Sequence, residues 1–175
     1  MINLENLNNT GVDKMAILEK LSIHKEETSS KVYFTFFGEF YKDEITSIMQ
    51  IPPTYSFNKG EKMRNKLTDD DNPPKYKFSR WSYGTDYENT RDIEEQCDRI
   101  IAQLKNKIPE ILSIIEHYNC KTEFVIVSVV EKGKTPALHF NQNILDFCIA
   151  VKADIDIDIY ANAYDESENI IEIDI

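Results

Sequence analysis

The chain has 175 residues, and its 20 Lys and Arg against 31 Asp and Glu give a formal net charge of −11. Apolar residues make up 41% and charged residues 29%, a balance that excludes wholesale disorder and a membrane-embedded protein. A chain of this length buries about 70% of its surface on folding, which predicts one domain with a substantial core. We expect a cytoplasmic protein, because the charged N-terminal region lacks the apolar core of a signal peptide and no stretch is long and apolar enough to span a bilayer.

The N-terminal part of the chain predicts an extension followed by the first strand. In residues 1–30, apolar positions recur at three-residue steps from Val12 to Leu21, and we interpret them as one short amphipathic helix of an N-terminal extension. Residues 31–38 are dense in aromatic and β-branched side chains, which predicts a strand. A short helix follows, with Asp43 as its expected cap. Its expected inward residues are Ile45, Ile48 and Met49.

The middle of the chain predicts a hairpin and then a long helix. Residues 55–84 carry turn and alternation signals, and a β-bulge near Ser79 would bring Phe78 and Trp81 to one face. Residues 90–118 show the strongest helical periodicity. Their expected buried stripe is Ile93, Cys97, Ile100, Ile101, Leu104, Ile108, Ile111, Leu112 and Ile115. Pro109 predicts a kink in this helix or two abutting helices.

The C-terminal part predicts three further strands and one helix. Residues 122–130 are apolar at both parities, as in a central strand covered on both faces. A shorter helix follows, with Asn141 as its expected cap and Ile144, Leu145, Cys148, Ile149 and Val151 facing inward. Residues 154–160 alternate strictly between Asp and Ile until Tyr160, and residues 170–175 repeat this alternation and would close a hairpin. Residues 31–175 therefore predict a single α+β domain, a two-layer sandwich in which a mostly antiparallel sheet carries a long helix and a shorter helix on one face.

Several short motifs follow one another along the chain: Glu44-Ile-Thr46, Ile51-Pro52-Pro53-Thr54, Lys59-Gly60-Glu61, Trp81, Gln96 and the alternation Asp154 to Tyr160. In their order and spacing they resemble the bacterial family called domain of unknown function 4279, over about residues 31–160. The resemblance implies a bacterial origin and the α+β fold, and it carries no catalytic activity. Small acidic bacterial proteins of this kind include immunity partners of toxins, so the resemblance also suggests that class of function.

The acidic C-terminus is the most informative feature of the charge pattern. From Ala153 to Ile175 the sequence has eight acidic residues and no Lys or Arg. In a strand, Asp154, Asp156 and Asp158 share one face at steps of about 7 Å. Glu172 and Asp174 would join them from a neighbouring strand. Such a face is either simply solvated or steers a basic protein partner, while a flat strand offers Ca²⁺ too few ligands. An internal alternative is that the basic segment 59–80 folds over this face.

Other chemistry finds little support in the residues. The segment 59–80 interleaves cations with aromatic side chains, a pattern that can bind single-stranded nucleic acid, but the overall negative charge of the chain disfavours that partner. The three histidines and three cysteines lie in no catalytic or metal-binding motif, and no glycine-rich phosphate loop is present. We therefore predict no catalytic residue, no cofactor and no metal.

These observations predict a non-enzymatic bacterial binding protein, with an immunity-type inhibitor as its candidate class, that meets a basic partner protein. The predicted partner-binding residues are Asp154, Asp156, Asp158, Glu172 and Asp174, with Trp81 or Tyr83 as an aromatic anchor if exposed. Two alternatives stay open. One is a small-molecule sensor or enzyme with a cleft near the hairpin 55–84, and the other is a structural or homo-oligomeric module in which the isoleucines of 171–175 pair across subunits.

Overall fold

A computed structural model describes residues 27–63, 73–90 and 92–162 of the chain. In chain order the elements are β1 (Ser29–Gly38), α2 (Lys42–Met49), β2 (Tyr55–Phe57), β3 (Ser79–Gly84), α3 (Glu94–Leu104), a 3-10 turn (Lys105–Lys107), α4 (Ile108–Tyr118), β4 (Lys121–Val130), α5 (Gln142–Ala150) and β5 (Asp154–Ala161). The predicted N-terminal helix and the predicted strand 170–175 lie outside the described residues.

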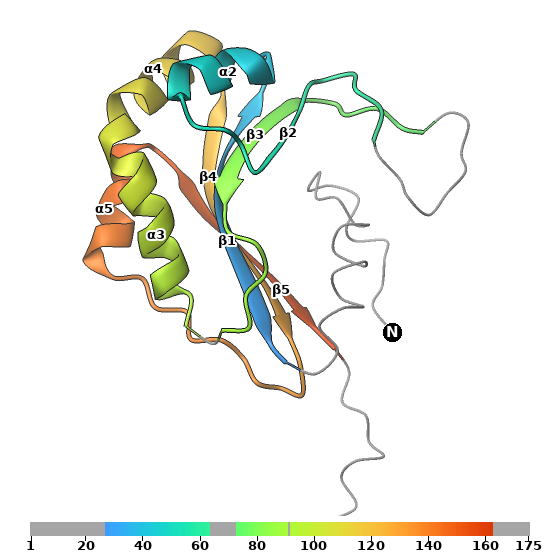
Figure 1. The fold of residues 1–175 in the computed structure, drawn as a ribbon, viewed down its shortest axis with the longest axis vertical. Coiled ribbons are helices and arrows are strands. Elements are labelled where there is room, and N and C mark those ends of the chain that lie inside the picture. Colours follow the sequence, from blue (N-terminus) through green and yellow to red (C-terminus); the bar gives the residue numbers. More distant parts are fainter. Residues whose placement is uncertain (1–26, 64–72, 91, 163–175) are drawn as a thin grey trace, which may run out of the picture.

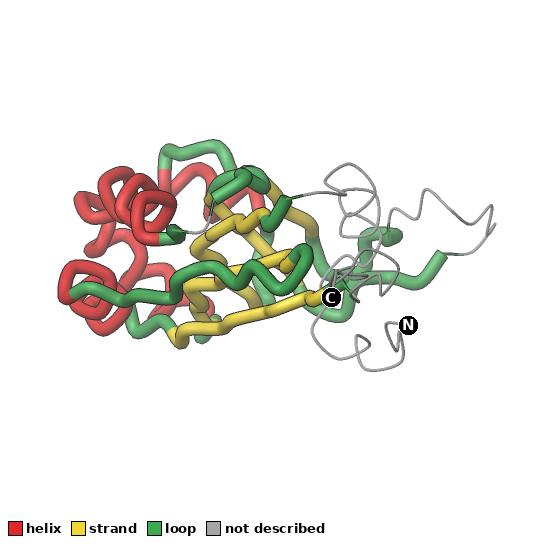
Figure 2. The backbone as a smooth tube through the Cα atoms, turned by 90° about the horizontal axis from the view of Figure 1, so that it is seen from below, coloured by secondary structure: helices red, strands yellow, loops and turns green. Residues whose placement is uncertain are grey.

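The strands form one five-stranded sheet in the order β2-β3-β1-β4-β5. The helices lie together on one side of this sheet, so the molecule has two layers (Figures 1 and 2). The predicted α+β class with a mostly antiparallel sheet is confirmed. One pair differs, because β4 and β5 run parallel. The reason is that α5 returns the chain across the helical layer before β5 begins, as a parallel connection requires.

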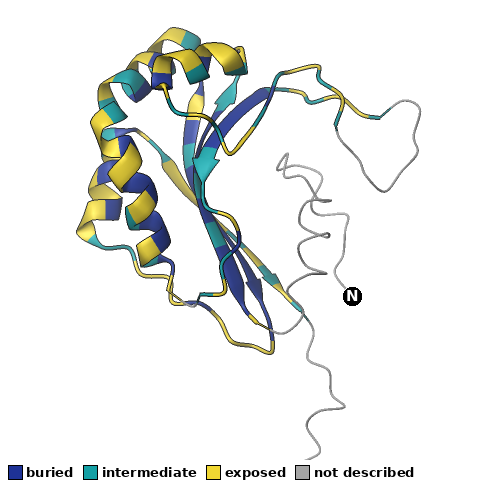
Figure 3. Cartoon of the chain, viewed as in Figure 1, coloured by how far each residue is buried: buried dark blue, intermediate teal, exposed yellow. Residues whose placement is uncertain are grey.

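The main core fills the space between the helices and the sheet. Phe34 and Phe36 of β1, Trp81 of β3 and Phe124 of β4 are fully buried in it. The indole Nε1 of Trp81 donates a hydrogen bond to Thr46 Oγ1 of α2 at 3.0 Å, which ties the helix to the sheet. β4 is buried on both faces between β1 and β5 (Figure 3), which confirms the expectation of a central strand.

The predicted long helix is two abutting helices. Pro109 lies in the first turn of α4, where its missing N–H leaves no helical hydrogen bond unmade. The intervening 3-10 turn has about three residues per turn instead of 3.6, so it shifts the phase of the buried stripe. α4 consequently buries Ile111 and Ile114, while Leu112 and Ile115 of the expected stripe are only half-buried.

Several predicted helix caps and inward-facing residues differ in the structure. The side chain of Asp43 does not cap α2; the N-cap is Tyr41, and the first helical N–H bonds to Asn58 Oδ1 at 2.8 Å. Asn141 caps α5 as predicted, accepting from the backbone N–H of Ile144 at 3.0 Å. Ile48, Leu145 and Ile149 were expected inside and are exposed. In these short helices only a narrow face touches the sheet, so residues one position off that face reach solvent.

The expected β-bulge near Ser79 is also wrong. The pairing of β3 with β1 runs without interruption from Gly38 opposite Ser79 to Tyr33 opposite Gly84. Phe78 precedes β3, and its ring meets that of Phe37 with centroids 6.1 Å apart. Phe37 faces away from the helices, because its neighbour Phe36 belongs to the main core. Phe78 and Trp81 therefore pack on opposite faces of the sheet.

Gly84 is required by the close approach of β3 to β1. A Cβ atom at this position would lie 2.3 Å from both Cβ of Tyr33 and the carbonyl oxygen of Val32. We expect Gly84→Ala to lower the free energy of unfolding by about 2–3 kcal/mol, because backbone atoms would have to move apart. Urea denaturation measures this loss. The comparison is Gly60→Ala, where φ is +86° and the added atom meets nothing within 4 Å, so only a backbone cost of about 1 kcal/mol is expected. A smaller loss for Gly84→Ala than for Gly60→Ala would contradict the packing argument.

Candidate functional site

Three carboxylates lie in a row on the side of the sheet that the described helices leave uncovered, here called the helix-free face. In the pairing of β5 with β4, Asp154 lies beside Glu123, Asp156 beside Val125 and Asp158 beside Val127. Laterally paired residues share a face, and Val125 and Val127 belong to a cluster separate from the helix-packed core. The alternation along β5 therefore places Asp154, Asp156 and Asp158, the acidic row, on the helix-free face. The isoleucines of β5 point to the helical side.

A valine and tyrosine cluster lies next to the acidic row. Val125, Val127 and Val129 of β4 are buried there, and three tyrosines, the tyrosine cluster, pack against or among them. These tyrosines are Tyr33, Tyr87 and Tyr160. Burial raises the pKa of Tyr33 and of Tyr160 to about 12, and the charge of Asp158 contributes to both shifts. Their hydroxyls therefore stay protonated at neutral pH.

Two cations of the chain itself lie on this face. The Nζ atom of Lys31 is 4.9 Å from the ring centroid of Tyr87 and 5.5 Å from that of Tyr33, within cation–π range. Arg80 of β3 is 6% exposed, and its guanidinium carbon lies 5.8 Å from the ring centroid of Phe78. The Nε atom of Arg80 is buried without a hydrogen-bond partner. On this face, two cationic side chains therefore lie against aromatic rings.

Two carboxylates of this face, those of Asp158 and Glu123, are ionised at a cost. Burial raises the pKa of Asp158 above its ordinary value and Asp156 raises it further, while Lys31 and Arg80 lower it. Burial likewise raises the pKa of Glu123, with Arg80 opposing and Asp156 and Asp154 adding to the increase. The internal cations therefore compensate these two carboxylates only in part. Any further cation placed on the acidic row would stabilise their ionised form.

The structure brings some predicted residues together and separates others. Asp154, Asp156 and Asp158 share one face of an ordered strand. Trp81 is fully buried in the helix-packed core, and Tyr83 packs against the same core, so neither is available as an anchor beside the acidic row. The tyrosine cluster takes that place. The sequence did not predict this cluster, because its tyrosines come from β1, from the loop after β3 and from β5, and they meet only on the valines of β4. Of the three, only Tyr160 lies within the acidic alternation. Glu172 and Asp174 lie outside the described residues.

The basic hairpin does not shield the acidic row in the described part of the chain. β2 is one edge of the sheet with β3 beside it, and β5 is the opposite edge. Lys59, at the hairpin, pairs with Glu39 instead. Arg80 is the described cation of this segment whose charge reaches Glu123 and Asp158. The internal explanation of the acidic row therefore rests on Arg80 alone among the described residues of 59–80.

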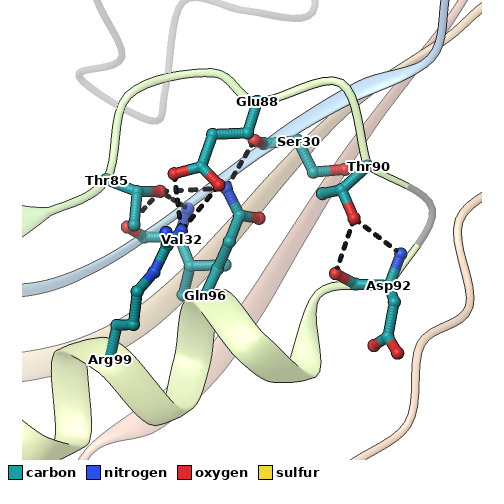
Figure 4. Close-up of polar contacts among 8 residues, drawn as sticks. All are labelled: Ser30, Val32, Thr85, Glu88, Thr90, Asp92, Gln96 and Arg99. Atoms are coloured by element: carbon teal, nitrogen blue, oxygen red, sulfur yellow. Dashed lines mark hydrogen bonds and ion pairs between the residues drawn. The ribbon is translucent and has the colours of Figure 1, made fainter.

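A separate cavity of about 450 Å³ lies between the end of β3 and α3, and Thr85, Glu88, Arg99 and Gln103 are among its lining residues. Figure 4 shows polar contacts of three of these residues, Thr85, Glu88 and Arg99, with their neighbours. Arg99 Nη2 is 2.6 Å from both carboxylate oxygens of Glu88. Gln96, buried at the same place, donates from Nε2 to the carbonyl of Ser30 at 2.9 Å and to Thr85 Oγ1 at 3.2 Å. Arg99 and Glu88 neutralise each other, so these contacts hold the loop after β3 onto α3.

Nucleophilic and metal chemistry have no assembled site among the described residues. Cys97, Cys120 and Cys148 are all buried. Burial raises the pKa of Cys120 and of Cys148 to about 11, which leaves both thiols protonated and weakly nucleophilic at neutral pH. Across 27–63, 73–90 and 92–162, no group of three or more His, Cys, Asp or Glu is arranged to hold a metal ion.

Within the described residues, no helix combines the length and apolar character needed to cross a bilayer.

The motif residues along the chain make tertiary contacts. Trp81 bonds to Thr46, Tyr118 donates from its hydroxyl to Glu44 Oε2 at 2.9 Å, and Gln96 bonds to Ser30. The family described as Domain of unknown function (DUF4279) matches residues 26–162, more than three quarters of the chain. No curated protein and no solved structure gives a significant match. The chain therefore belongs to the DUF4279 family.

Proposed function

We propose that this protein is a non-enzymatic binding protein whose acidic row, with the tyrosine cluster beside it, meets a basic partner protein. The observation that carries the proposal is the placement of Asp154, Asp156 and Asp158 side by side on an ordered strand of the helix-free face. A row of one charge sign steers an oppositely charged partner and favours it over other proteins. β5 itself contains no Lys or Arg, and the cations that lower the pKa of Asp158, Lys31 and Arg80, come from other strands.

The partial burial of the Asp158 and Glu123 carboxylates supports the same proposal. The raised pKa values of Asp158 and Glu123 mean that their charges lack full compensation in the free protein. A Lys or Arg side chain from a partner would supply it. Lys31 already illustrates this mode, because its ammonium group lies over Tyr33 and Tyr87 while lowering the pKa of Asp158. The partner's cations would find similar aromatic and acidic neighbours along the row.

An immunity-type inhibitor of a basic toxin is the finer form of this proposal. It is supported by the acidic charge of the chain, −11, and by a binding face made of side chains without catalytic chemistry. Such an inhibitor has to bind and cover its target rather than transform it. The identity of the captured partner tests this finer form directly.

Charge reversal of the acidic row tests the binding proposal. We expect Asp156→Lys/Asp158→Lys to lose the partners that the wild-type protein captures from native lysate, because four units of charge change on the binding face. Pull-down at low and at moderate salt, followed by protein identification, measures the loss. Capture by the wild type should itself weaken as salt rises, since salt screens exposed charges.

The matched control for charge reversal is Glu95→Lys/Glu116→Lys, which makes the same change of net charge on α3 and α4. Both residues are exposed on the helical layer. The control should retain the partners of the wild type. Equal capture by the wild type and by Asp156→Lys/Asp158→Lys at both salt concentrations would sink the proposal.

A pH-dependent stability measurement tests the cost of the acidic row. Because the pKa of Asp158 is higher in the folded protein than its ordinary value of 3.8, the protein is relatively stabilised below that value and loses this stability as pH rises through the folded-state pKa. Asp158→Asn removes the titration. We expect the variant to gain a few tenths of a kcal/mol up to about 1 kcal/mol in unfolding free energy at pH 7, since the site is partly solvated. At pH 3 the gain should vanish.

Urea denaturation of the wild type and Asp158→Asn at both pH values gives this comparison. Asp146→Asn, on the exposed part of α5, is the control and should change stability little at either pH. A loss of stability at pH 7 in Asp158→Asn would instead show that the ionised carboxylate holds the free fold together, and would remove the argument from uncompensated charge.

A further inference from the structure

In the part of the chain that the structure describes, no strand lies along the outer edge of β5. β5 ends the sheet and pairs with β4 from Asp154 beside Glu123 to Ala161 beside Val130. Within the described ranges no other strand pairs with it. Its eight residues include no Pro, Gly, Lys or Arg, the residues that commonly interrupt or guard an edge strand. Among the described residues, one set of its backbone N–H and C=O groups therefore has no strand partner.

The side chains of β5 present two different rows to such a strand. On the helical side, the isoleucine row consists of Ile155, Ile157 and Ile159, which are 36%, 37% and 51% exposed. These values are high for isoleucine in a sheet whose inner strands are mostly buried, and Figure 3 shows the contrast between β5 and its neighbours. On the helix-free face lies the acidic row. A strand added here would contact apolar groups on one side and carboxylates on the other.

The charges of β5 decide which strand fits. A second copy of β5 would set aspartates against aspartates, and like charges on adjacent strands destabilise their pairing. A segment with Lys or Arg at every second position would instead place a cation beside each aspartate. Its intervening apolar residues would cover the isoleucine row, because successive side chains of a strand point to opposite faces.

We propose that β5 accepts an extended segment of the partner protein as a sixth strand, and that this segment alternates between apolar residues and Lys or Arg. The proposal rests on the proposed function and specifies its geometry. Backbone hydrogen bonds along β5 would supply affinity that does not depend on the partner's sequence. The isoleucine row and the acidic row would select the alternating pattern.

Three capped peptides of eight residues, matched to the length of β5, test the proposal on the full chain. The first alternates Lys and Val. The second has the same composition, with the four Lys and the four Val in separate blocks. The third has the alternating sequence with its backbone amides N-methylated, which preserves charge and removes the donors that pair strands. We expect the alternating peptide to bind about tenfold tighter than either of the others, because only it can combine backbone pairing with both side-chain rows. Calorimetric titration at low salt gives the affinities.

A protein variant locates the binding to the edge of β5. Ile157→Lys puts a charge in the isoleucine row while leaving the acidic row intact, and it should reduce binding of the alternating peptide to the level of the block peptide. Ile149→Lys, at a 75% exposed apolar position on α5, should leave binding unchanged. In the wild type, amide hydrogen exchange along β5 should slow when the alternating peptide is bound.

The outcomes separate the two proposals. If all three peptides bind equally and Asp156→Lys/Asp158→Lys weakens them, the acidic row binds cations through side chains alone and strand addition is overturned. Unchanged amide exchange along β5 in the peptide complex overturns it as well. If none of the peptides binds at low salt, strand addition is overturned, while the pull-down comparison of the wild type with Asp156→Lys/Asp158→Lys still decides the proposed function.

Discussion

The register between β4 and β5 determines what the protein presents to its surroundings. A shift of one residue would turn the acidic row toward the helical layer and the isoleucines outward, because neighbouring side chains on a strand point to opposite faces. Thr122, at the start of β4, opposes such a shift. Its hydroxyl bonds to the carbonyl oxygens of Val151 and Lys152, both at 3.1 Å, in the turn that leads into β5. The buried end of α5, the turn and the first residues of both strands thus form one fixed unit, and the acidic row inherits its position from it.

The helix-free face follows from the double-sided character of β4. An inner strand with apolar residues at both parities needs cover on both faces, but the described helices cover only one. The tyrosine cluster supplies part of the second cover. Tyrosine suits this position because its ring packs on the valines while its hydroxyl keeps a polar group at the surface. The same arrangement lowers the local polarity around Asp158 and Glu123, which is why burial raises the pKa of both. The tyrosine cluster therefore both covers the valines of β4 and contributes to the raised pKa values of Asp158 and Glu123.

Local patterns in the sequence predicted the elements, and the features they missed are those set by pairing between distant segments. The alternation of Asp and Ile was sufficient to predict β5 and its two faces, and Pro109 predicted the break between α3 and α4. Trp81 was expected as a possible anchor, yet which face of β3 it occupies depends on its pairing with Phe36. The parallel pairing of β5 and the reach of Arg80 toward Glu123 likewise depend on strand order, which periodicity does not contain. The acidic row was therefore predictable, while its aromatic and cationic neighbours were not.

The composition of β5 bears on which strands its outer edge can pair with, since β4 is the one described strand beside it. Exposed isoleucines along an edge strand favour association, and by themselves they would do so without discrimination. The aspartates on the opposite face make that association conditional. They oppose a second β5, and they penalise any acidic segment by repulsion, whereas a basic segment gains from them. Discrimination of this kind requires a repulsive element as well as an attractive one. In β5 the two elements alternate residue by residue, and the proposed selectivity for a basic, alternating segment rests on this alternation.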